Sequence, residues 1–252
     1  MSKPPKHHQN NAELINQELI EKIMVDDRFS SGERLRNLPL FFRQKDLSHI
    51  LFMNEIYQKI INVSGYIAEF GLMWGRNLNL FHAFRETYEP LNHTRHLIGF
   101  DTFNGFISTD HKDFGDGEPN MYKTGAYSVP KDHKELLDEL LKSQTSISHL
   151  SHLTRHNLIE GDVMETFPRY LEDNKHAYFA LVYFDLDLYK PTKELLGFLK
   201  TRMTKGSVLV FDEALNSEYP GETQAIAEVL GLGNISLQRT PFSGWKTYCV
   251  WE

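Results

Sequence analysis

The chain has 252 residues, 40% of them hydrophobic and 12% aromatic, and this length suits one large domain better than two. Its 27 Lys and Arg residues against 34 Asp and Glu residues give a formal charge of −7, without a long basic run. This balance argues against nucleic acid or an anionic membrane as a partner and favours a small molecule.

The single cysteine, Cys249, lies in the apolar alternation TYCVW and is expected to be a buried strand residue. With one cysteine, neither a disulfide within the chain nor a thiolate metal cluster is possible. No apolar run approaches the roughly eighteen residues of a membrane span, and no signal peptide is apparent. The sequence therefore predicts a protein of the reducing cytoplasm.

The first 63 residues are expected to be helical after a short tail. Residues 1–11 are polar and predicted to be disordered, and His7 and His8 are interpreted as part of this tail. From Ala12 to Val63 the apolar positions recur at helical spacing, with breaks at residues 30–32 and at Pro39. We expect residues 12–252 to form one domain, with a helical layer over 12–63 and an α/β core over 65–252.

From Tyr66 onward, short apolar strands alternate with amphipathic helices, which predicts a mostly parallel sheet covered on both faces. The predicted strands are YIAEFG, HLIGFD, HNLIEGD, YFALVYFDLD and GSVLVFDE, and helices are expected near 76–89, 131–143, 164–173, 191–203 and 222–230. ISLQRT and KTYCVW predict an antiparallel hairpin at the sheet edge, giving seven strands. The long polar loop 102–130 is typical of a lid.

Every predicted core strand ends in or near an acidic residue. Because the carboxyl ends of parallel strands meet at one edge of the sheet, these acids are expected to converge there. A cluster of this kind is costly without a cationic partner, and helix capping alone is a poor account of so many coincidences. The acids are Glu69, Asp101, Asp162, Asp185 with Asp187, and Asp212 with Glu213.

The first strand and helix suggest a nucleoside site without a phosphate clamp. EFGLMWGRN places Gly71 and Gly75 at the turn, but it is neither a dinucleotide fingerprint nor a phosphate-binding loop. Asp101, followed by Thr102 and Phe103 in GFDTFNGF, lies where such sheets bind ribose hydroxyls, and Asp162 is a candidate to face the adenine. S-adenosyl-L-methionine fits this pattern, with its ammonium group at Glu69.

Six motifs occur in an order that resembles the macrocin O-methyltransferase-like family. They are AEFGLMWGRNLNLF, IGFDTFNGF, GDVMETFP, LVYFDLDLYKPT, KGSVLVFDE and PGETQAIAEVLGL, within residues 65–251. The resemblance implies a Rossmann-like class I methyltransferase that uses S-adenosyl-L-methionine to methylate sugar hydroxyls of natural products. It also implies Mg²⁺ held by Asp185, Asp212 and Glu213, which would orient the acceptor and lower its hydroxyl pKa.

Two features depart from the family pattern. The usual Val-Trp-Arg/Lys-Gly of the first turn reads Leu-Met-Trp-Gly at 72–75, without the basic side chain, and the second metal position is Glu213 where Asp is commoner. Relatives use a histidine of the long loop as general base, and the candidates in this chain are His111 and His133. Each of them also fits a plain surface histidine.

Two other functions remain open from the sequence. FDLDLYKPT also resembles the Asp-x-Asp signature of haloacid dehalogenase-like phosphohydrolases, with Asp185 as nucleophile and Asp187 as acid/base, although only 65 residues follow Asp187. A catalytically silent protein that binds S-adenosyl-L-methionine is the second alternative. Residue types alone do not separate a sugar from another hydroxyl acceptor, and a homo-oligomer is left open.

Overall fold

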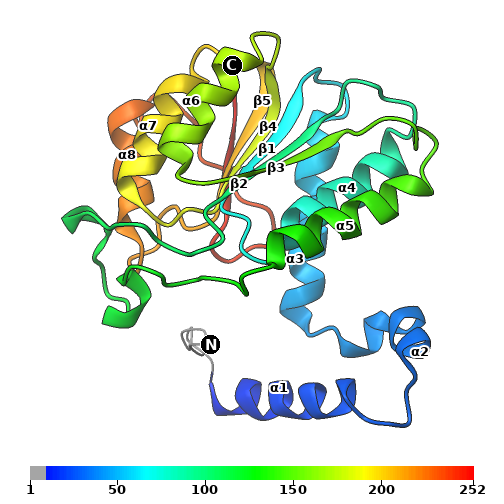
Figure 1. Cartoon of the computed structure of the whole chain (residues 1–252). Coiled ribbons are helices and arrows are strands. Elements are labelled where there is room, and N and C mark those ends of the chain that lie inside the picture. Colours follow the sequence, from blue (N-terminus) through cyan, green and yellow to red (C-terminus); the bar gives the residue numbers. More distant parts are fainter. Residues whose placement is uncertain (1–9) are drawn as a thin grey trace. The chain divides into compact units, whose positions relative to one another are not determined.

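The computed structural model describes residues 10–252 (Figure 1). Residues 1–9, which hold most of the predicted tail with His7 and His8, lie outside the described residues. The chain divides into two compact units, one ending at Leu51 and the other comprising Phe52–Glu252. In the described part of the chain, none of the helices combines the length and apolar composition that crossing a bilayer requires.

The first unit consists of short helices whose starts are specified by capping residues. Asn10 and Glu13 form a capping box at the start of the first helix, which includes the last residue of the predicted tail, and Ser30 and Glu33 form another at the second. The cap at Ser30 explains the break expected at residues 30–32, and the break at Pro39 corresponds to a separate 3₁₀ helix that has this proline in its first turn. The elements are α1 (Asn11–Met24), α2 (Ser31–Arg36), η1 (Leu38–Phe41) and the start of α3 (Gln44–Ile60).

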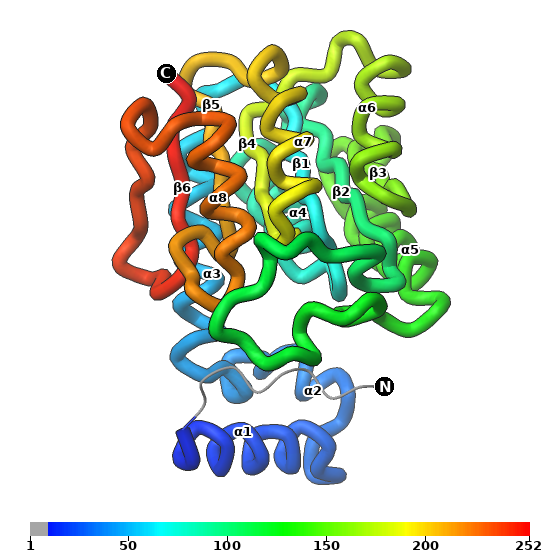
Figure 2. The backbone as a smooth tube through the Cα atoms, turned by 90° about the vertical axis from the view of Figure 1, so that its left-hand side faces the viewer, coloured from blue at the N-terminus to red at the C-terminus, as the bar shows by residue number. Residues whose placement is uncertain are grey.

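The second unit is built on one sheet with the strand order β3-β2-β1-β4-β5-β6 (Figure 2). All neighbouring pairs are parallel except β5 with β6, so the Rossmann-like fold and its antiparallel edge are confirmed. The strands are β1 (Tyr66–Phe70), β2 (Leu97–Asp101), β3 (His156–Glu160), β4 (Phe179–Phe184), β5 (Met203–Phe211) and β6 (Thr247–Val250).

Alternate residues of the strands feed two hydrophobic cores, one on each face of the sheet. Phe70 and Phe100 pack toward α6 (Val163–Asp173), α7 (Tyr189–Leu199) and α8 (Pro220–Val229). Ile67 and Leu97 pack toward residues 52–60 of α3, α4 (Arg76–Tyr88) and α5 (His133–Ser146). With helices on both faces, the sheet presents its carboxyl edge as the place for loops and ligands (Figure 1).

The prediction of seven strands is wrong by one, because the sheet within residues 10–252 has six strands. ISLQRT forms no strand, and its pairing with KTYCVW is reduced to one antiparallel bridge between Gln238 and Tyr248. Pro241 follows closely and has no N–H to extend the ladder, while β6 already pairs with β5 along its other edge.

Loop 102–130 is folded back onto the carboxyl edge of the sheet through two short 3₁₀ helices, η2 (His111–Asp113) and η3 (Pro119–Tyr122). The buried Asp113 carboxylate accepts the backbone N–H of Tyr189, at the start of α7, at 2.6 Å. The backbone N–H of Asp116 donates to the carbonyl of Ser217 at 3.0 Å. The loop thus lies over the segments that follow β4 and β5, as a lid would.

Gly71 is required by a close contact between the ends of β1 and β4. It has φ 86°, and a Cβ at this position would lie 1.9 Å from the carbonyl oxygen of Asp185. The Asp185 N–H donates to the Phe70 carbonyl at 2.8 Å, so neither segment is free to move away. A side chain at residue 71 would therefore clash with backbone.

We expect Gly71→Ala to lower the free energy of unfolding by about 2–4 kcal/mol, through the clash and the left-handed backbone. Gly197→Ala in α7 is the matched control, because nothing lies within 4 Å of its Cβ position. It should raise the free energy of unfolding by about 0.5–1 kcal/mol. Urea denaturation of both variants checks this, and equal effects would contradict the steric account.

Candidate functional site

Strained backbone marks the carboxyl edge of the sheet. Within residues 10–252, five residues other than glycine have positive φ: Met73 (48°), Phe103 (54°), Tyr127 (64°), Asp187 (60°) and Leu215 (69°). Four of them follow the ends of β1, β2, β4 and β5, and the fifth lies in loop 102–130. Left-handed residues with side chains cost energy and gather at functional sites, so this edge is the candidate site.

The acids predicted at the ends of β4 and β5 converge here. Burial and the carboxylates of Asp212 and Glu213 raise the pKa of Asp185 well above its ordinary value. Burial and Glu213 do the same for the pKa of Asp187, and burial with Asp212 raises the pKa of Glu213 to about 7. Such mutual repulsion requires that these groups lie close together, and it calls for a cation.

Most of these carboxylates have at least one hydrogen-bond partner. The Tyr183 hydroxyl and the Lys246 ammonium both donate to Asp212. The Asn77 side-chain amide lies 3.4 Å from Asp185 Oδ2. Asn216 donates to the Glu213 carboxylate. Asp187 receives no hydrogen bond from the described part of the chain and is partly open to solvent.

The proposed metal ligands have suitable chemistry, because Asp185, Asp212 and Glu213 offer the hard oxygens that Mg²⁺ prefers. As the side chains stand, no group of three or more His, Cys, Asp or Glu residues within 10–252 is arranged to hold a metal ion. Asp212 is instead engaged by Lys246. The magnesium site stays a prediction that needs these side chains to rearrange.

Glu69, near the end of β1, is a buried carboxylate in need of a positive partner. It is fully buried, and neither of its oxygens accepts a hydrogen bond of good geometry, although the nearby Asn77 side chain acts to lower its pKa. Burial and the nearby Asp185 raise its pKa well above the ordinary value. An ammonium group brought by a ligand would satisfy both oxygens, which agrees with the role predicted for Glu69.

The other predicted cofactor residues of the first turn have roles within the fold. Asp101 Oδ2 accepts the N–H groups of Leu72 and Met73 at 2.5 and 2.8 Å, and its Oδ1 accepts that of Phe103 at 2.5 Å. Gly75 precedes α4 with φ 75°, and a Cβ there would lie 2.4 Å from Leu137 of α5. Asp101 thus fixes the turn, and its contact with a ribose stays a prediction.

Thr102, Phe103 and Asp162 also satisfy local needs. The Thr102 hydroxyl donates to the Gly105 carbonyl at 2.7 Å, and the Phe103 ring is buried in the core on the α3–α5 face. Asp162 caps α6 by accepting the Met164 N–H at 2.9 Å. Their predicted contacts with the cofactor are compatible with these roles but are not tested by them.

The two histidines proposed as general base have partners other than Asp185, Asp187, Asp212 and Glu213. The side chain of His111 is 83% exposed and pairs with Asp110 at 2.7 Å. His133 is buried at the start of α5, where its ring packs edge-on against Trp74 at 4.9 Å between centroids. Neither forms a hydrogen bond or ion pair with the clustered acids, so the geometry favours neither as the base.

Four residues of the site were not identified from the sequence. Glu222 of α8 is fully buried, accepts the Glu213 N–H at 2.9 Å, and has its other oxygen unpartnered. The Tyr127 and Tyr219 hydroxyls contact each other, and burial raises their pKa values, with smaller contributions from Asp187 and Glu213. Lys246 is the fourth. Glu222 could have been noticed in PGETQ, but the others depend on contacts distant in sequence.

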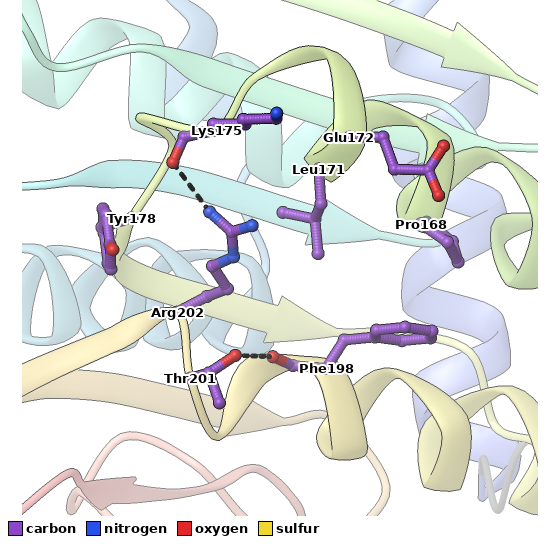
Figure 3. Close-up of a pocket in the computed structure, with 8 residues that line it drawn as sticks. All are labelled: Pro168, Leu171, Glu172, Lys175, Tyr178, Phe198, Thr201 and Arg202. Atoms are coloured by element: carbon purple, nitrogen blue, oxygen red, sulfur yellow. Dashed lines mark hydrogen bonds between the residues drawn. The ribbon is translucent and has the colours of Figure 1, made fainter.

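A cavity of about 600 Å³ lies elsewhere in the same unit (Figure 3). It is formed at the ends of α6 and α7, near the start of β4, and Lys175, Tyr178 and Arg202 are among its lining residues. This is the amino edge of the sheet, opposite the acids. The cavity contains none of the predicted site residues and is not part of the candidate site.

Comparison with solved structures identifies similar proteins. The crystal structure of CalS11, a calicheamicin methyltransferase, shares 38% identity at a TM-score of 0.93, covering 97% of this chain and 95% of that one. Apo CalS11, described as a TDP-rhamnose 3'-O-methyltransferase of calicheamicin biosynthesis, shares 35% identity at a TM-score of 0.85, covering 97% and 96%. The O-methyltransferase NovP, with 16% identity, a TM-score of 0.61 and coverage of 81% and 79%, shares the fold.

No protein-family model matches the chain, and no curated protein matches it by sequence.

The raised pKa of Glu213 predicts a loss of stability as pH rises in metal-free protein. Its folded-state pKa of about 7 lies above the ordinary value of 4.5, so the unfolded state ionises first. Protonated Glu213 therefore contributes up to about 3 kcal/mol of stability that is fully present below about pH 4.5 and is lost as pH rises to about 7. Asp185, Asp187 and Glu222 have raised pKa values and act in the same direction.

We therefore expect Glu213→Gln to flatten this pH dependence and to raise the free energy of unfolding at pH 8 by about 1–3 kcal/mol. The exposed Glu139 of α5 provides the control, and Glu139→Gln should follow the wild type within about 0.5 kcal/mol. Urea unfolding in EDTA between pH 4 and pH 8 measures the difference. If the free energy of unfolding changes with pH in the same way for Glu213→Gln and wild type, the neighbouring carboxylates do not raise the pKa of Glu213.

Proposed function

The chain belongs to the macrocin O-methyltransferase-like family of class I S-adenosyl-L-methionine-dependent O-methyltransferases, and on that premise we propose that its acceptor is a sugar hydroxyl of a natural-product pathway. The observation that carries this proposal is the likeness to CalS11 along nearly the whole of both chains. CalS11 is a TDP-rhamnose 3'-O-methyltransferase, so a nucleotide-linked deoxyhexose is the first acceptor to test.

S-adenosyl-L-methionine, when bound, supplies a methyl group on a positively charged sulfur. We assign Glu69 to its ammonium group, because the two unpartnered oxygens of this buried carboxylate need a positive donor. Asp101 holds the turn at residues 72–75 in place through the N–H groups of Leu72 and Met73 and also accepts that of Phe103, and we assign the free lone pairs of its carboxylate to the ribose. Asp162, at the start of α6, is assigned to the adenine side.

We propose Asp185, Asp212 and Glu213 as ligands for Mg²⁺. Their oxygens suit this ion, and the repulsion that raises the pKa values of Asp185 and Glu213 is the electrostatic condition a divalent cation would relieve. When bound, the ion would lower the pKa of the acceptor hydroxyl. The chain's own part is to hold the carboxylates in place, through Tyr183 at Asp212 and Asn216 at Glu213.

We assign the role of proton acceptor to Asp187, in place of the histidines expected from the sequence. Asp187 has a left-handed backbone, and its carboxylate lies near those of Asp185 and Glu213. No described residue donates a hydrogen bond to it. The Tyr127 hydroxyl, paired with that of the buried Tyr219, lies in the same region and would contact the sugar beneath loop 102–130. A carboxylate free of hydrogen bonds and partly open to solvent is available to take the acceptor proton.

The haloacid dehalogenase-like alternative is wrong, because the chain matches a methyltransferase along almost its entire length. Asp185 and Asp187 follow the fourth strand of the chain, whereas the Asp-x-Asp signature opens its domain. The lack of a nucleic-acid or membrane partner and a location in the cytoplasm remain proposals from the sequence, and a homo-oligomer remains open.

The cofactor assignment predicts opposite effects of Glu69→Gln on binding and on stability. Loss of the negative charge should weaken S-adenosyl-L-methionine by about 10- to 100-fold, as expected for a charge-assisted contact of about 1–3 kcal/mol. The free energy of unfolding should rise or stay unchanged, because an unpaired buried carboxylate is removed. Calorimetry with S-adenosyl-L-methionine and with NAD, and urea unfolding, measure both effects, with Glu139→Gln as control.

Wild type is expected to bind S-adenosyl-L-methionine and not NAD, since the first turn has no pyrophosphate fingerprint. Preferential binding of NAD would overturn the cofactor assignment, and unchanged affinity in Glu69→Gln would remove Glu69 from the cofactor site.

Asp185→Asn tests the acceptor and the metal together. Methyl transfer from labelled S-adenosyl-L-methionine to TDP-rhamnose should occur with wild type and Mg²⁺, and should fall about 100- to 1000-fold in the variant, as loss of about 3–4 kcal/mol of transition-state stabilisation implies. Stability should stay the same or rise as repulsion falls. The assay is repeated with EDTA, and Glu139→Gln serves as control.

A wild type that is indifferent to EDTA, with a fully active Asp185→Asn variant, would contradict the metal-assisted mechanism. Absence of transfer to TDP-rhamnose and to other sugar acceptors, with transfer to a phenol, would contradict the sugar assignment.

A further inference from the structure

Lys246 is placed in the acid cluster by the register of the antiparallel edge. Phe211, the last residue of β5, pairs with Thr247, the first of β6. Continuing this register by one residue sets Asp212 opposite Lys246, and side chains at such paired positions lie on the same face of the sheet. The Lys246 ammonium contacts the Asp212 carboxylate, and both side chains are largely buried, at 16% and 12% exposed.

The surroundings of Lys246 are strongly negative. Asp212, Asp185 and Glu213 all attract its ammonium, and they raise its pKa although burial alone would lower it. The exposed Arg76 also acts on Asp185, but it forms no ion pair with the cluster within the described residues. Lys246 is therefore the side-chain cation in direct contact with the proposed metal ligands.

Glu222 indicates that one lysine does not satisfy the cluster. This carboxylate is fully buried, and its Oε1 has no hydrogen-bond partner. Its Oε2 holds the backbone N–H of Glu213, so the residue lies against the second half of the acidic pair. Among the described residues, the Lys246 ammonium forms an ion pair only with Asp212, and Oε1 of the buried Glu222 has no hydrogen-bond partner. The site can therefore accept further positive charge.

We propose that Lys246 is a built-in counter-ion that competes with the divalent cation for Asp212, so that its departure from this carboxylate sets the affinity of the metal site. The proposal rests on the proposed function, because it takes Asp185, Asp212 and Glu213 as the metal ligands. Without the cation, Lys246 neutralises Asp212 and stabilises the fold. With the cation, the ammonium leaves Asp212, because a carboxylate oxygen that holds the lysine is not free to hold the ion.

The test is calorimetric titration of Mg²⁺ into wild type, Lys246→Met and Lys246→Gln, with thermal unfolding of each protein in EDTA and in Mg²⁺. Lys246→Gln keeps a hydrogen-bond donor without the charge, in case the methionine variant does not fold. Lys142→Met on α5 is the control, because Lys142 is an exposed lysine paired with Asp138, outside the cluster. Binding of S-adenosyl-L-methionine confirms that each variant is folded.

We expect both Lys246 variants to bind Mg²⁺ about 10- to 100-fold more tightly than wild type, a change of about 1.4–2.8 kcal/mol. Both should unfold at a lower temperature in EDTA and regain the difference in Mg²⁺. Lys142→Met should bind Mg²⁺ like wild type.

A folded Lys246 variant with wild-type or weaker Mg²⁺ affinity would overturn the competition while leaving Mg²⁺-dependent methyl transfer by wild type, and hence the proposed function, intact. If neither wild type nor any variant binds Mg²⁺, both the competition and the assignment of the metal ligands are overturned. In that case, methyl transfer to TDP-rhamnose in EDTA would show that the sugar methyltransferase assignment survives.

Discussion

Repulsion between carboxylates that cannot avoid one another shapes this site, because five parallel strands deliver their acidic ends to one edge of a sheet. Burial strengthens the repulsion, since water no longer screens the charges, and the pKa values of Glu69, Asp185 and Glu222 rise as a result. Positive charge relieves it. In this chain Lys246 contacts Asp212 and Arg76 lowers the pKa of Asp185, and the proposed ammonium group at Glu69 and cation at Asp185 would add to them.

The fold keeps these acids together by making the loops around them rigid and strained. Gly71 lets the ends of β1 and β4 touch, which fixes Asp185 next to the cofactor turn. Asp187 and Tyr127 adopt left-handed backbones, and Tyr127 belongs to a loop anchored through Asp113 on the start of α7. Two packed cores behind the edge supply the stability that such strain and repulsion consume.

Short apolar strands alternating with helices were enough to predict the parallel sheet and its acidic edge, because both follow from local pattern and chain direction. The hairpin at ISLQRT was wrong, since alternation does not reveal that β6 finds its partner in β5. Contacts between residues that are distant in sequence could not be predicted either. Asp101 looked like a ribose ligand, and only the structure shows it bound to three backbone N–H groups. Lys246 required the β5–β6 register.

The departure from the commoner Asp-Asp pair has a structural account in this chain. Glu213 is one methylene longer than Asp, and its carboxylate reaches the side-chain amide of Asn216 while its backbone N–H is held by Glu222. The longer side chain is therefore fixed at both ends, and Glu222 of α8 adds a buried acid next to Asp212 and Glu213. Burial and repulsion among these acids give a physical reason for a lysine to be placed against Asp212, just before the neighbouring strand β6.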